Sequence, residues 1–396
     1  GRVSRYHPRV LTLLTTLLLC PQEPLQVFLE APDGALLTHD LATPLAAPLP
    51  EGVSFVRYSE PAMVPAAQAG SAAVELLDGG RVTAQVIGGE GDFVDVSILG
   101  DARLRVSVDE LSSIVISDRI PAAWGSRLEP SDEGDRVYRL APRGLERLEG
   151  TLEEFTETGL LFATRVGSKE LPWSEVCALF IEPLGEEPLV PPSGQLVVVD
   201  LADGGRLHAG LLEIRAAEMD LVTRAGRGLR LKRPAVAELF VPGSGARYLS
   251  ELTPQAVGPE GSPFGDGFGM VWPHRLDRSV SGGPLRCGGR LYTRGIGVHA
   301  PSKLRWELDG SWSALKLAIG VDDEVLELAG RGSVIFRVVV DGEARFESEV
   351  MRGGRAPLEV PRISLDGAAE LRLEVEMASD LHVADRADWL RPVLIR

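Results

Sequence analysis

Short runs in which apolar and polar residues alternate recur along much of the chain. Residues 95–99 and 103–108 alternate with period two, and in residues 370–377 the apolar positions 371, 373, 375 and 377 face away from the charged ones. Such alternation over four to eight residues is typical of half-buried β-strands. The hydrophobic pattern therefore predicts an all-β fold.

A pattern of about 42 residues occurs three times without gaps. Residues 75–116 align with residues 200–241 at an offset of 125, which places Asp78-Gly79-Gly80-Arg81 on Asp203-Gly204-Gly205-Arg206. Residues 140–181 supply a third copy, at offsets of 65 and 60. Three gap-free copies indicate an array of one repeated structural unit.

Each copy reads as an apolar strand, a glycine turn and further strands separated by polar turns. We therefore predict three small antiparallel β repeats at residues 71–120, 136–184 and 194–243, similar in size and strand number to SH3 or Sm-type barrels. Units this small bury little surface alone, so we expect them to pack on one another or on the C-terminal region.

The amino end has the pattern of a secretory signal peptide. Arg2, Arg5 and Arg9 precede ten mostly apolar residues, a run too short to cross a bilayer as a helix. We expect a signal-like segment at residues 1–20 and an exported protein, in the periplasm, at the cell surface or outside the cell. Leucines stand before Cys20 where a lipoprotein needs small residues, which disfavours lipid anchoring.

The next segment, residues 21–70, is rich in Pro and Ala. This composition predicts a poorly ordered linker, with one short hairpin around Asp33-Gly34. Beyond the amino end, no stretch approaches the ~20 apolar residues of a transmembrane helix, so no membrane span is predicted.

The strand pattern is clearest in residues 246–396. Predicted strands cover residues 315–319, 333–340, 344–350, 358–363, 370–377 and 393–395. Asp341-Gly342 and Asp366-Gly367 supply hairpin turns between them. Six to nine short strands at this spacing predict a β-sandwich of two sheets.

Charge and cysteine content exclude several classes of protein. A formal net charge of −16 argues against a nucleic-acid partner, because phosphate recognition needs a basic face. Cys20, Cys177 and Cys287 are too few and too scattered for a disulfide scaffold, and a Cys177–Cys287 bridge would have to join two domains. Cys177 aligns with small residues of the other copies, which favours a free buried thiol.

Five motifs of the C-terminal region, in the same order, resemble the NPCBM family, also called carbohydrate-binding module family 51. They are Tyr248-Leu249-Ser250-Glu251-Leu252, Asp277-Arg278-Ser279-Val280, Arg294-Gly295-Ile296-Gly297-Val298-His299-Ala300-Pro301-Ser302, Gly320-Val321-Asp322-Asp323-Glu324 and Gly332-Ser333-Val334-Ile335-Phe336-Arg337-Val338. The resemblance implies a galactose-binding-like jelly-roll sandwich, galactose-type ligands and a structural calcium ion. The family's ending Asp-His-Ala-Asp-Trp reads Asp385-Arg386-Ala387-Asp388-Trp389 here, so Arg386 replaces a histidine.

Sugar binding needs an aromatic face for the pyranose C–H surface and polar groups for the hydroxyls. Trp272 follows a Gly-rich loop, Trp312 adjoins a turn, and His299 belongs to the third motif. His382 and Arg386 precede the last strand. We take these five residues as candidate carbohydrate ligands. Packing in the protein interior is the alternative for each.

Calcium requires hard oxygen ligands from carboxylates and carbonyls. The resemblance implies ligands near the start of the domain and near its last strand, where Asp277 and Asp388 stand. Ordinary turn or salt-bridge roles for both carboxylates are the alternative.

No G-x-S-x-G, P-loop, H-E-x-x-H or C-x-x-C motif occurs, so the sequence does not predict an enzyme. The first hypothesis is an exported, non-catalytic protein that binds a galactose-containing glycan through its sandwich. In that case the β repeats are a spacer or a docking surface for a protein partner. The alternative is a structural or protein-interaction role in which the sandwich has lost its sugar site.

Overall fold

The computed structural model describes residues 25–60, 62–63, 68–121, 124, 128–131, 133–183, 190–257, 271–328, 330–378 and 384–396. Within these ranges the regular elements are β-strands and short 3₁₀ helices, and all strand pairs are antiparallel. The predicted all-β class is confirmed. The signal-like segment at residues 1–20, which includes Cys20, and the candidate ligand His382 lie outside the described residues.

The three aligned copies contain the same succession of five strands. The first has β5 (Ala72–Leu76), β6 (Arg81–Glu90), β7 (Phe93–Ile98), β8 (Ala102–Ser107) and β9 (Leu111–Val115). The second has β10 (Asp135–Ala141), β11 (Gly144–Phe155), β12 (Gly159–Thr164), β13 (Gly167–Pro172) and β14 (Val176–Phe180). The third has β15 (Gln195–Leu201), β16 (Arg206–Ile214), β17 (Glu218–Val222), β18 (Gly228–Lys232) and β19 (Val236–Phe240). Short 3₁₀ helices are η1 (Val108–Glu110), η2 (Ser117–Arg119) and η4 (Arg233–Ala235).

A bulge in the second strand lets each unit curl. The first strand pairs with both the second and the fifth, and the second continues into pairing with the third. In β6 the register shifts between Val86 and Gly88, and in β16 between Leu211 and Glu213, at aligned positions. A bulge bends a strand and increases its twist. Each copy is thereby a strongly bent five-stranded sheet.

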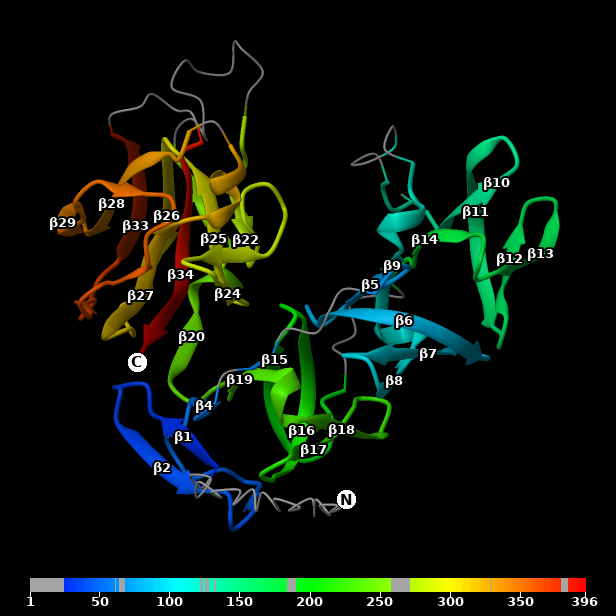
Figure 1. Cartoon of the computed structure of the whole chain (residues 1–396), viewed down its shortest axis with the longest axis horizontal. Helices are drawn as coiled ribbons and strands as arrows, with labels where there is room; N and C mark the ends of the chain where they lie inside the picture. Colours follow the sequence, from blue (N-terminus) through cyan, green and yellow to red (C-terminus); the bar gives the residue numbers. More distant parts are fainter. Residues whose placement is uncertain are drawn as a thin grey trace, which may run out of the picture.

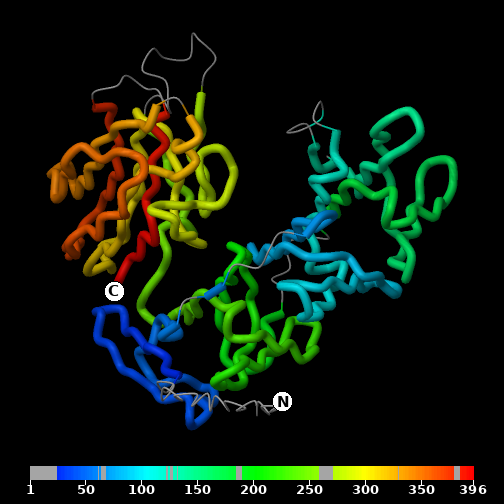
Figure 2. The backbone as a smooth tube through the Cα atoms, in the orientation of Figure 1, coloured from blue at the N-terminus to red at the C-terminus, as the bar shows by residue number. Residues whose placement is uncertain are grey.

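The copies do not lie in their chain order (Figures 1 and 2). Strand β14 of the second copy pairs with β9 of the first, and β16 of the third pairs with β6 of the first at Arg206 and Arg81. The first copy therefore lies in the middle. One hydrophobic core runs from residue 27 to residue 241 through all three copies, as expected for units too small to bury a core alone.

The predicted linker is wrong for residues 25–60. This segment forms β1 (Gln26–Glu30), β2 (Leu36–Asp40), β3 (Leu45–Ala46) and β4 (Phe55–Tyr58). β1 and β2 make the hairpin expected at Asp33-Gly34, where Gly34 has φ of 93°. β4 pairs with β19, so its apolar residues complete the core of the third copy. The prolines lie between the strands, where they remove no ladder hydrogen bond.

Residues 246–395 form the sandwich. One sheet contains β20 (Ala246–Tyr248), β22 (Arg275–Leu276), β25 (Gly295–His299), β27 (Ala314–Val321), β31 (Leu358–Glu359), β32 (Ile363–Ser364) and β34 (Arg386–Ile395). The other contains β21 (Gln255–Ala256), β26 (Ser302–Glu307), β28 (Ser333–Val340), β29 (Glu343–Glu347), β30 (Met351–Arg352) and β33 (Glu370–Met377). A separate hairpin is β23 (Leu285–Cys287) with β24 (Arg290–Tyr292), and 3₁₀ helices are η5 (Leu249–Glu251) and η7 (Asp323–Glu327).

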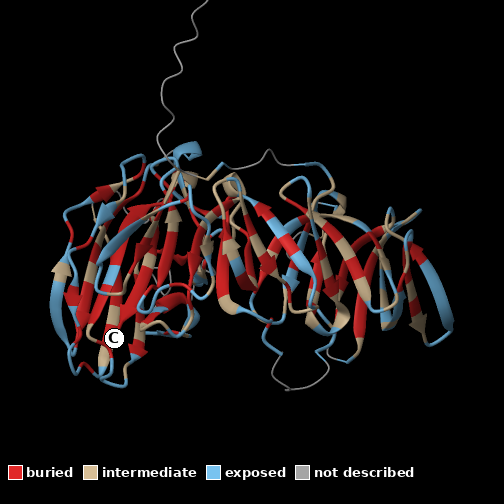
Figure 3. Cartoon of the chain, turned by 90° about the horizontal axis from the view of Figure 1, so that it is seen from below, coloured by how far each residue is buried: buried red, intermediate tan, exposed pale blue. Residues whose placement is uncertain are grey.

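Alternating residues of the two sheets make a second core (Figure 3). Phe336 and Trp389, from opposite sheets, meet edge to face with ring centroids 4.9 Å apart. β28 and β33 have the predicted bounds, and Asp341 and Gly342 both have positive φ, as the two-residue hairpin requires. The strand predicted at residues 358–363 is instead two short pieces, and the final strand begins at Arg386.

An apolar cluster joins the sandwich to the rest of the chain. Phe55 of β4 and Phe240 of β19 pack on Tyr248 of β20, with ring centroids 5.2–5.9 Å from it. Val393 and Ile395 of β34 complete the same cluster. Phe55 is far in the sequence from Phe240 and Tyr248, which are close in sequence but belong to the third copy and to the sandwich. This contact therefore fixes the third copy and the amino-terminal strands against the sandwich.

A buried ion-pair network lies beside this cluster. Arg206 of the third copy donates to Asp200 at 3.0 Å and to Asp277 of the sandwich at 2.7 Å. Arg294 Nε lies 3.5 Å from the Asp200 carboxylate. The guanidinium carbon of Arg294 lies over the Tyr248 ring, 4.6 Å from its centroid. Arg81 of the first copy donates to the Asp277 carbonyl at 2.8 Å. The two arginines of the repeated Asp-Gly-Gly-Arg motif thus both reach Asp277.

Asp277 keeps its charge in this environment. Burial alone raises the pKa of its carboxyl group, but the guanidinium groups of Arg206 and Arg294 hold that pKa below its usual value. Because the folded-state pKa is lowered, the stabilisation is present above the unfolded-state pKa and is lost as the pH falls through the folded one.

We predict that Arg206→Ala destabilises the protein by about 3–5 kcal/mol, because two buried carboxylates lose the nearer of their two guanidinium partners. Urea denaturation monitored by tryptophan fluorescence measures this loss. Arg230→Ala is the control, since Arg230 is exposed and pairs on the surface with Asp220, and it should have little effect. Equal stability of the two variants would contradict the role given to Arg206.

Candidate functional site

Four side chains gather at the end of the sandwich where β34 begins. His299, the last residue of β25, lies directly opposite Arg386, the first residue of β34. Trp272 stacks on His299, with ring centroids 5.5 Å apart and an interplanar angle of 18°. The Arg386 guanidinium carbon lies 5.3 Å from the Trp272 centroid, and its Nη1 lies 3.2 Å from the carboxylate of Glu324. We call these four residues the Trp272 cluster.

Glu324 is the acidic member of the Trp272 cluster. It belongs to η7, whose N-cap Asp322 accepts a hydrogen bond from the Glu324 backbone N–H at 2.8 Å. Ser281 donates to its carboxylate at 3.1 Å and Ser279 at 3.3 Å. Burial and the nearby charge of Asp322 raise the pKa of Glu324, while Arg386 opposes the rise. The cluster therefore combines hydroxyl, carboxylate and guanidinium groups around an aromatic ring.

The ring of His299 itself is covered. Its exposed fraction is 4%, and its Nδ1 lies 2.8 Å from the Ala300 carbonyl, an acceptor for a ring N–H. Trp272, Arg386 and Glu324 keep partial exposure. Ligand contact would consequently fall to these three residues, with His299 as the support beneath Trp272.

Trp312 does not belong to this cluster. It lies before β27 near the carboxyl end of β34, where the Arg396 guanidinium carbon is 4.8 Å from its ring centroid. Arg386 and Ile395 are nine residues apart along β34, which separates the two ends of this strand by about 30 Å. Trp312 lies at one end and the Trp272 cluster at the other. Trp312 is buried in the sandwich core, which is a structural role.

The two predicted calcium ligands are not equivalent. Asp277 is held by Arg206 and by the Gly295 N–H at 3.0 Å, so its oxygens already have cationic and N–H partners. This arrangement does not fit the predicted metal role. Asp388 has a different environment: it is buried beside the carboxyl group of Asp322, with which it can share a hydrogen bond, and among the described residues no N–H group or cation binds its oxygens.

Asp388 lies under the segment that connects β22 to β25. Gly320 stands opposite Asp388 in the sheet, and a Cβ there would come within 2.2 Å of the Cys287 sulfur, so a glycine is needed for the covering hairpin to approach. Asp322 lies near Asp388, and its own carboxylate accepts from Arg286 N–H at 3.1 Å. Burial, then repulsion from Asp322, raises the pKa of Asp388 well above its usual value.

These acids do not make a complete metal site by themselves. Among the described residues no group of three or more His, Cys, Asp or Glu side chains has metal-binding geometry. Of the two predicted ligands, Asp388 is the one whose carboxylate has no cationic or N–H partner among the described residues. Cys177 and Cys287 are both buried and free, in separate clusters.

Glu324 is the member of the Trp272 cluster that the sequence did not single out as a ligand. Its acidic motif, Asp322-Asp323-Glu324, reads in the sequence as a turn at the end of a strand. The signal for a site is the long-range pairing of β25, β27 and β34, which no local pattern contains.

Residues 245–395 match the NPCBM/NEW2 domain, so the C-terminal module belongs to that domain family.

Two relatives are similar over part of the chain. A protein of Renibacterium salmoninarum named as an endo-alpha-N-acetylgalactosaminidase is 34% identical over 181 residues, and alpha-1,3-galactosidase B of Akkermansia muciniphila is 38% identical over 120 residues. The matches cover 45% and 29% of this chain but only 11% and 14% of those relatives.

Solved structures that match include CBM51 from Clostridium perfringens GH95 in complex with methyl-galactose, at 26% identity and a TM-score of 0.32. That match covers 38% of this chain and 99% of the other. CBM51-2 with the INT domains of Clostridium perfringens ZmpB is 27% identical, with a TM-score of 0.33, and covers 38% of this chain and 31% of that one.

In the part of the chain that the structure describes, no helix has the length and apolar character needed to cross a membrane.

The environment of Asp388 leads to a pH prediction. Because its folded-state pKa is raised, burial of Asp388 costs no stability below the unfolded-state pKa and becomes destabilising as the pH rises toward the folded one. With chelator present, we expect the melting temperature to fall between pH 5 and pH 8, and to fall less in Asp388→Asn. Identical slopes for the two proteins, measured by differential scanning fluorimetry, would contradict this assignment.

Proposed function

We propose that the protein is an exported, non-catalytic carbohydrate-binding protein whose sandwich binds a galactose-containing glycan at the Trp272 cluster. The assembly of Trp272, Arg386 and Glu324 at one end of the sandwich carries the proposal. Membership of residues 245–395 in the NPCBM/NEW2 domain supports it, as does the methyl-galactose bound in the Clostridium perfringens relative.

The chemistry of the Trp272 cluster suits a sugar. An indole ring offers an apolar surface to the C–H face of a pyranose. The planar guanidinium of Arg386 and the carboxylate of Glu324, 3.2 Å apart, present a donor and an acceptor to adjacent hydroxyls. Because the two groups neutralise each other before a ligand arrives, the cluster favours a neutral glycan over a charged one.

The second candidate is a structural or protein-interaction role, and one observation favours it. The Arg386 guanidinium lies over Trp272 and is already paired with Glu324, where the resembling family has a histidine. In this alternative Arg386 takes the place of the sugar. The three repeats would then offer the surface for a protein partner.

A binding experiment on the full chain tests the first candidate. We expect Trp272→Ala to weaken binding of a galactose-terminated oligosaccharide at least about tenfold, because the stacking face is lost. The melting temperature should change little, since Trp272 is only half buried. Isothermal titration calorimetry and a glycan array give the two readouts.

Trp124→Ala is the matched control, because Trp124 is also half buried and packs on Tyr138 in the second copy. It should leave glycan affinity unchanged.

Arg386→His separates the two candidates. Binding by wild type supports the proposed function, whereas binding that appears only in Arg386→His supports the lost-site alternative.

We also propose a structural calcium ion that uses Asp388 and not Asp277. The open carboxylate of Asp388 and the neighbouring Asp322 supply hard oxygen donors, and a cation would remove the repulsion between them.

Calcium at millimolar concentration should raise the melting temperature relative to chelator, because a ligand bound only by the native state adds stability. The shift should disappear in Asp388→Asn and persist in Glu374→Gln, a control carboxylate on the other sheet. A calcium shift that is unchanged in Asp388→Asn would place the ion elsewhere.

A further inference from the structure

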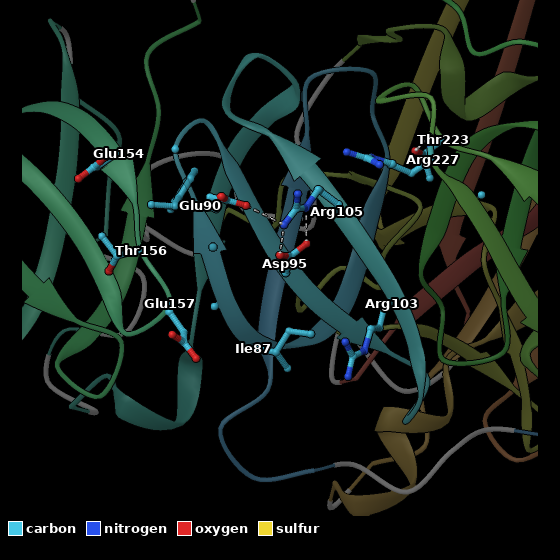
Figure 4. Close-up of a pocket in the computed structure, with 15 residues that line it drawn as sticks. Ile87, Glu90, Asp95, Arg103, Arg105, Glu154, Thr156, Glu157, Thr223 and Arg227 are labelled. Carbon is cyan, nitrogen blue, oxygen red and sulfur yellow. Dashed lines mark hydrogen bonds and ion pairs between the residues drawn. The ribbon is translucent and has the colours of Figure 1, made fainter.

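A polar cleft of about 840 Å³ lies among the three copies, far from the sandwich end just described (Figure 4). Its lining comes from β6, β7 and β8 of the first copy with the turn at residue 91, from residues 154–157 of the second copy and from residues 223, 227 and 228 of the third. The volume falls within the range of roughly 300–1,000 Å³ that small-molecule sites occupy. The proposed glycan site of the sandwich does not use this cleft.

Glycines of β6 let the first two copies meet at the cleft. A Cβ on Gly89 would lie 2.6 Å from the Cβ of Phe155, and Gly88 has φ of 143°. The Phe155 N–H donates to the Gly91 carbonyl at 2.7 Å across the same contact. The third copy has Glu213 and Ile214 at the positions aligned with this glycine pair, so the close contact is a property of the first copy.

One side of the cleft carries an excess of positive charge. Arg105 binds Asp95 through two hydrogen bonds of 2.7 Å. That pairing lowers the pKa of Asp95, and the positive charges of Arg103 and Arg227 lower it further. In the described part of the chain, the side chains of Arg103 and Arg227 have no hydrogen-bond or ion-pair partner.

The opposite side carries acceptors. Figure 4 shows Glu154, Thr156 and Glu157 across the cleft from Arg103 and Arg227, with Glu90 between the two sides. Carboxylates and a hydroxyl accept hydrogen bonds from ligand hydroxyls. The aromatic residue of the lining, Phe155, is buried against Trp173, so the cleft offers no open ring for a base or another aromatic ligand.

We propose that this cleft binds an anionic saccharide, with its carboxylate or sulfate group held by Arg103 and Arg227 and its hydroxyls by Glu154 and Glu157. Guanidinium groups form short, charge-assisted bonds to such anions. An acidic peptide would pair with the arginines equally well. Its carboxylates would offer no hydroxyl donors to Glu154 and Glu157, and the negative charges of these glutamates would repel it. The protein would then bind glycans at two chemically different places.

Isothermal titration calorimetry on the full chain in 50 mM salt tests the proposal. The probes are trigalacturonate, its fully methyl-esterified form, galactose 6-sulfate, galactose and triglutamate. We expect one or both anionic sugars to bind, and the methyl ester to bind at least about tenfold more weakly than trigalacturonate if the carboxylate is the recognised group. Affinity should fall with added salt, because the contact is between exposed charges.

Arg103→Ala/Arg227→Ala should weaken binding of the anionic sugar about tenfold or more. Arg143→Ala/Arg165→Ala is the matched control, since both arginines are exposed and lie outside the cleft, and it should bind as wild type does. Trp272→Ala should also bind normally, which separates this site from the sandwich. Absence of anionic sugar binding, equal binding of the methyl ester, tighter binding of triglutamate, or no effect of the double variant would each overturn the proposal.

Discussion

The arrangement of the molecule depends on the ion pair between Arg206 and Asp277. The pair connects a strand of the third copy to the sandwich. Both side chains are buried, so water cannot solvate one charge if the other is removed. Asp200, Arg294 and Arg81 extend the pair into a network, and the apolar cluster of Tyr248 packs beside it. A charged contact of this kind adds specificity of docking more than stability, because desolvation offsets much of the attraction. The sandwich is therefore held in one orientation against the repeats.

This docking gives the sandwich end a fixed place. β34 begins at the Trp272 cluster and ends at the junction with the repeats, so the cluster faces away from that junction (Figure 1). The same strand carries Arg386 to the cluster, Asp388 beneath the covering hairpin and Val393 to the interdomain contact. The Trp272 cluster, the buried acid pair and the docking of the sandwich are consequently linked through one β-strand.

Local patterns predicted much of the fold. Alternation located β28 and β33, the Asp-Gly pair located their hairpin, and the alignment of three copies located the repeats. The prediction of a linker failed for residues 25–60. The prolines that suggested it lie in the loops, whereas β3 and β4 pair with β16 and β19. Of the candidate ligands, Trp272, His299 and Arg386 meet, whereas Trp312 and Asp277 have structural partners. Those outcomes depend on contacts between distant strands, which a single sequence does not contain.

The pairing of β4 with β19 has a consequence for how the chain reaches its native state. Residues 55–56 find their partners at residues 239–240, and Lys316 binds Glu30 at 2.6 Å. Contacts with such long sequence separation require closure of large loops, which slows folding. During synthesis the strands at residues 25–60 would emerge before the third copy, and their apolar faces would stay uncovered until that copy had followed. In that interval they are candidates for chaperone binding or for misassembly. The aligned copies add to this risk, because strands of one copy resemble the correct partners of another.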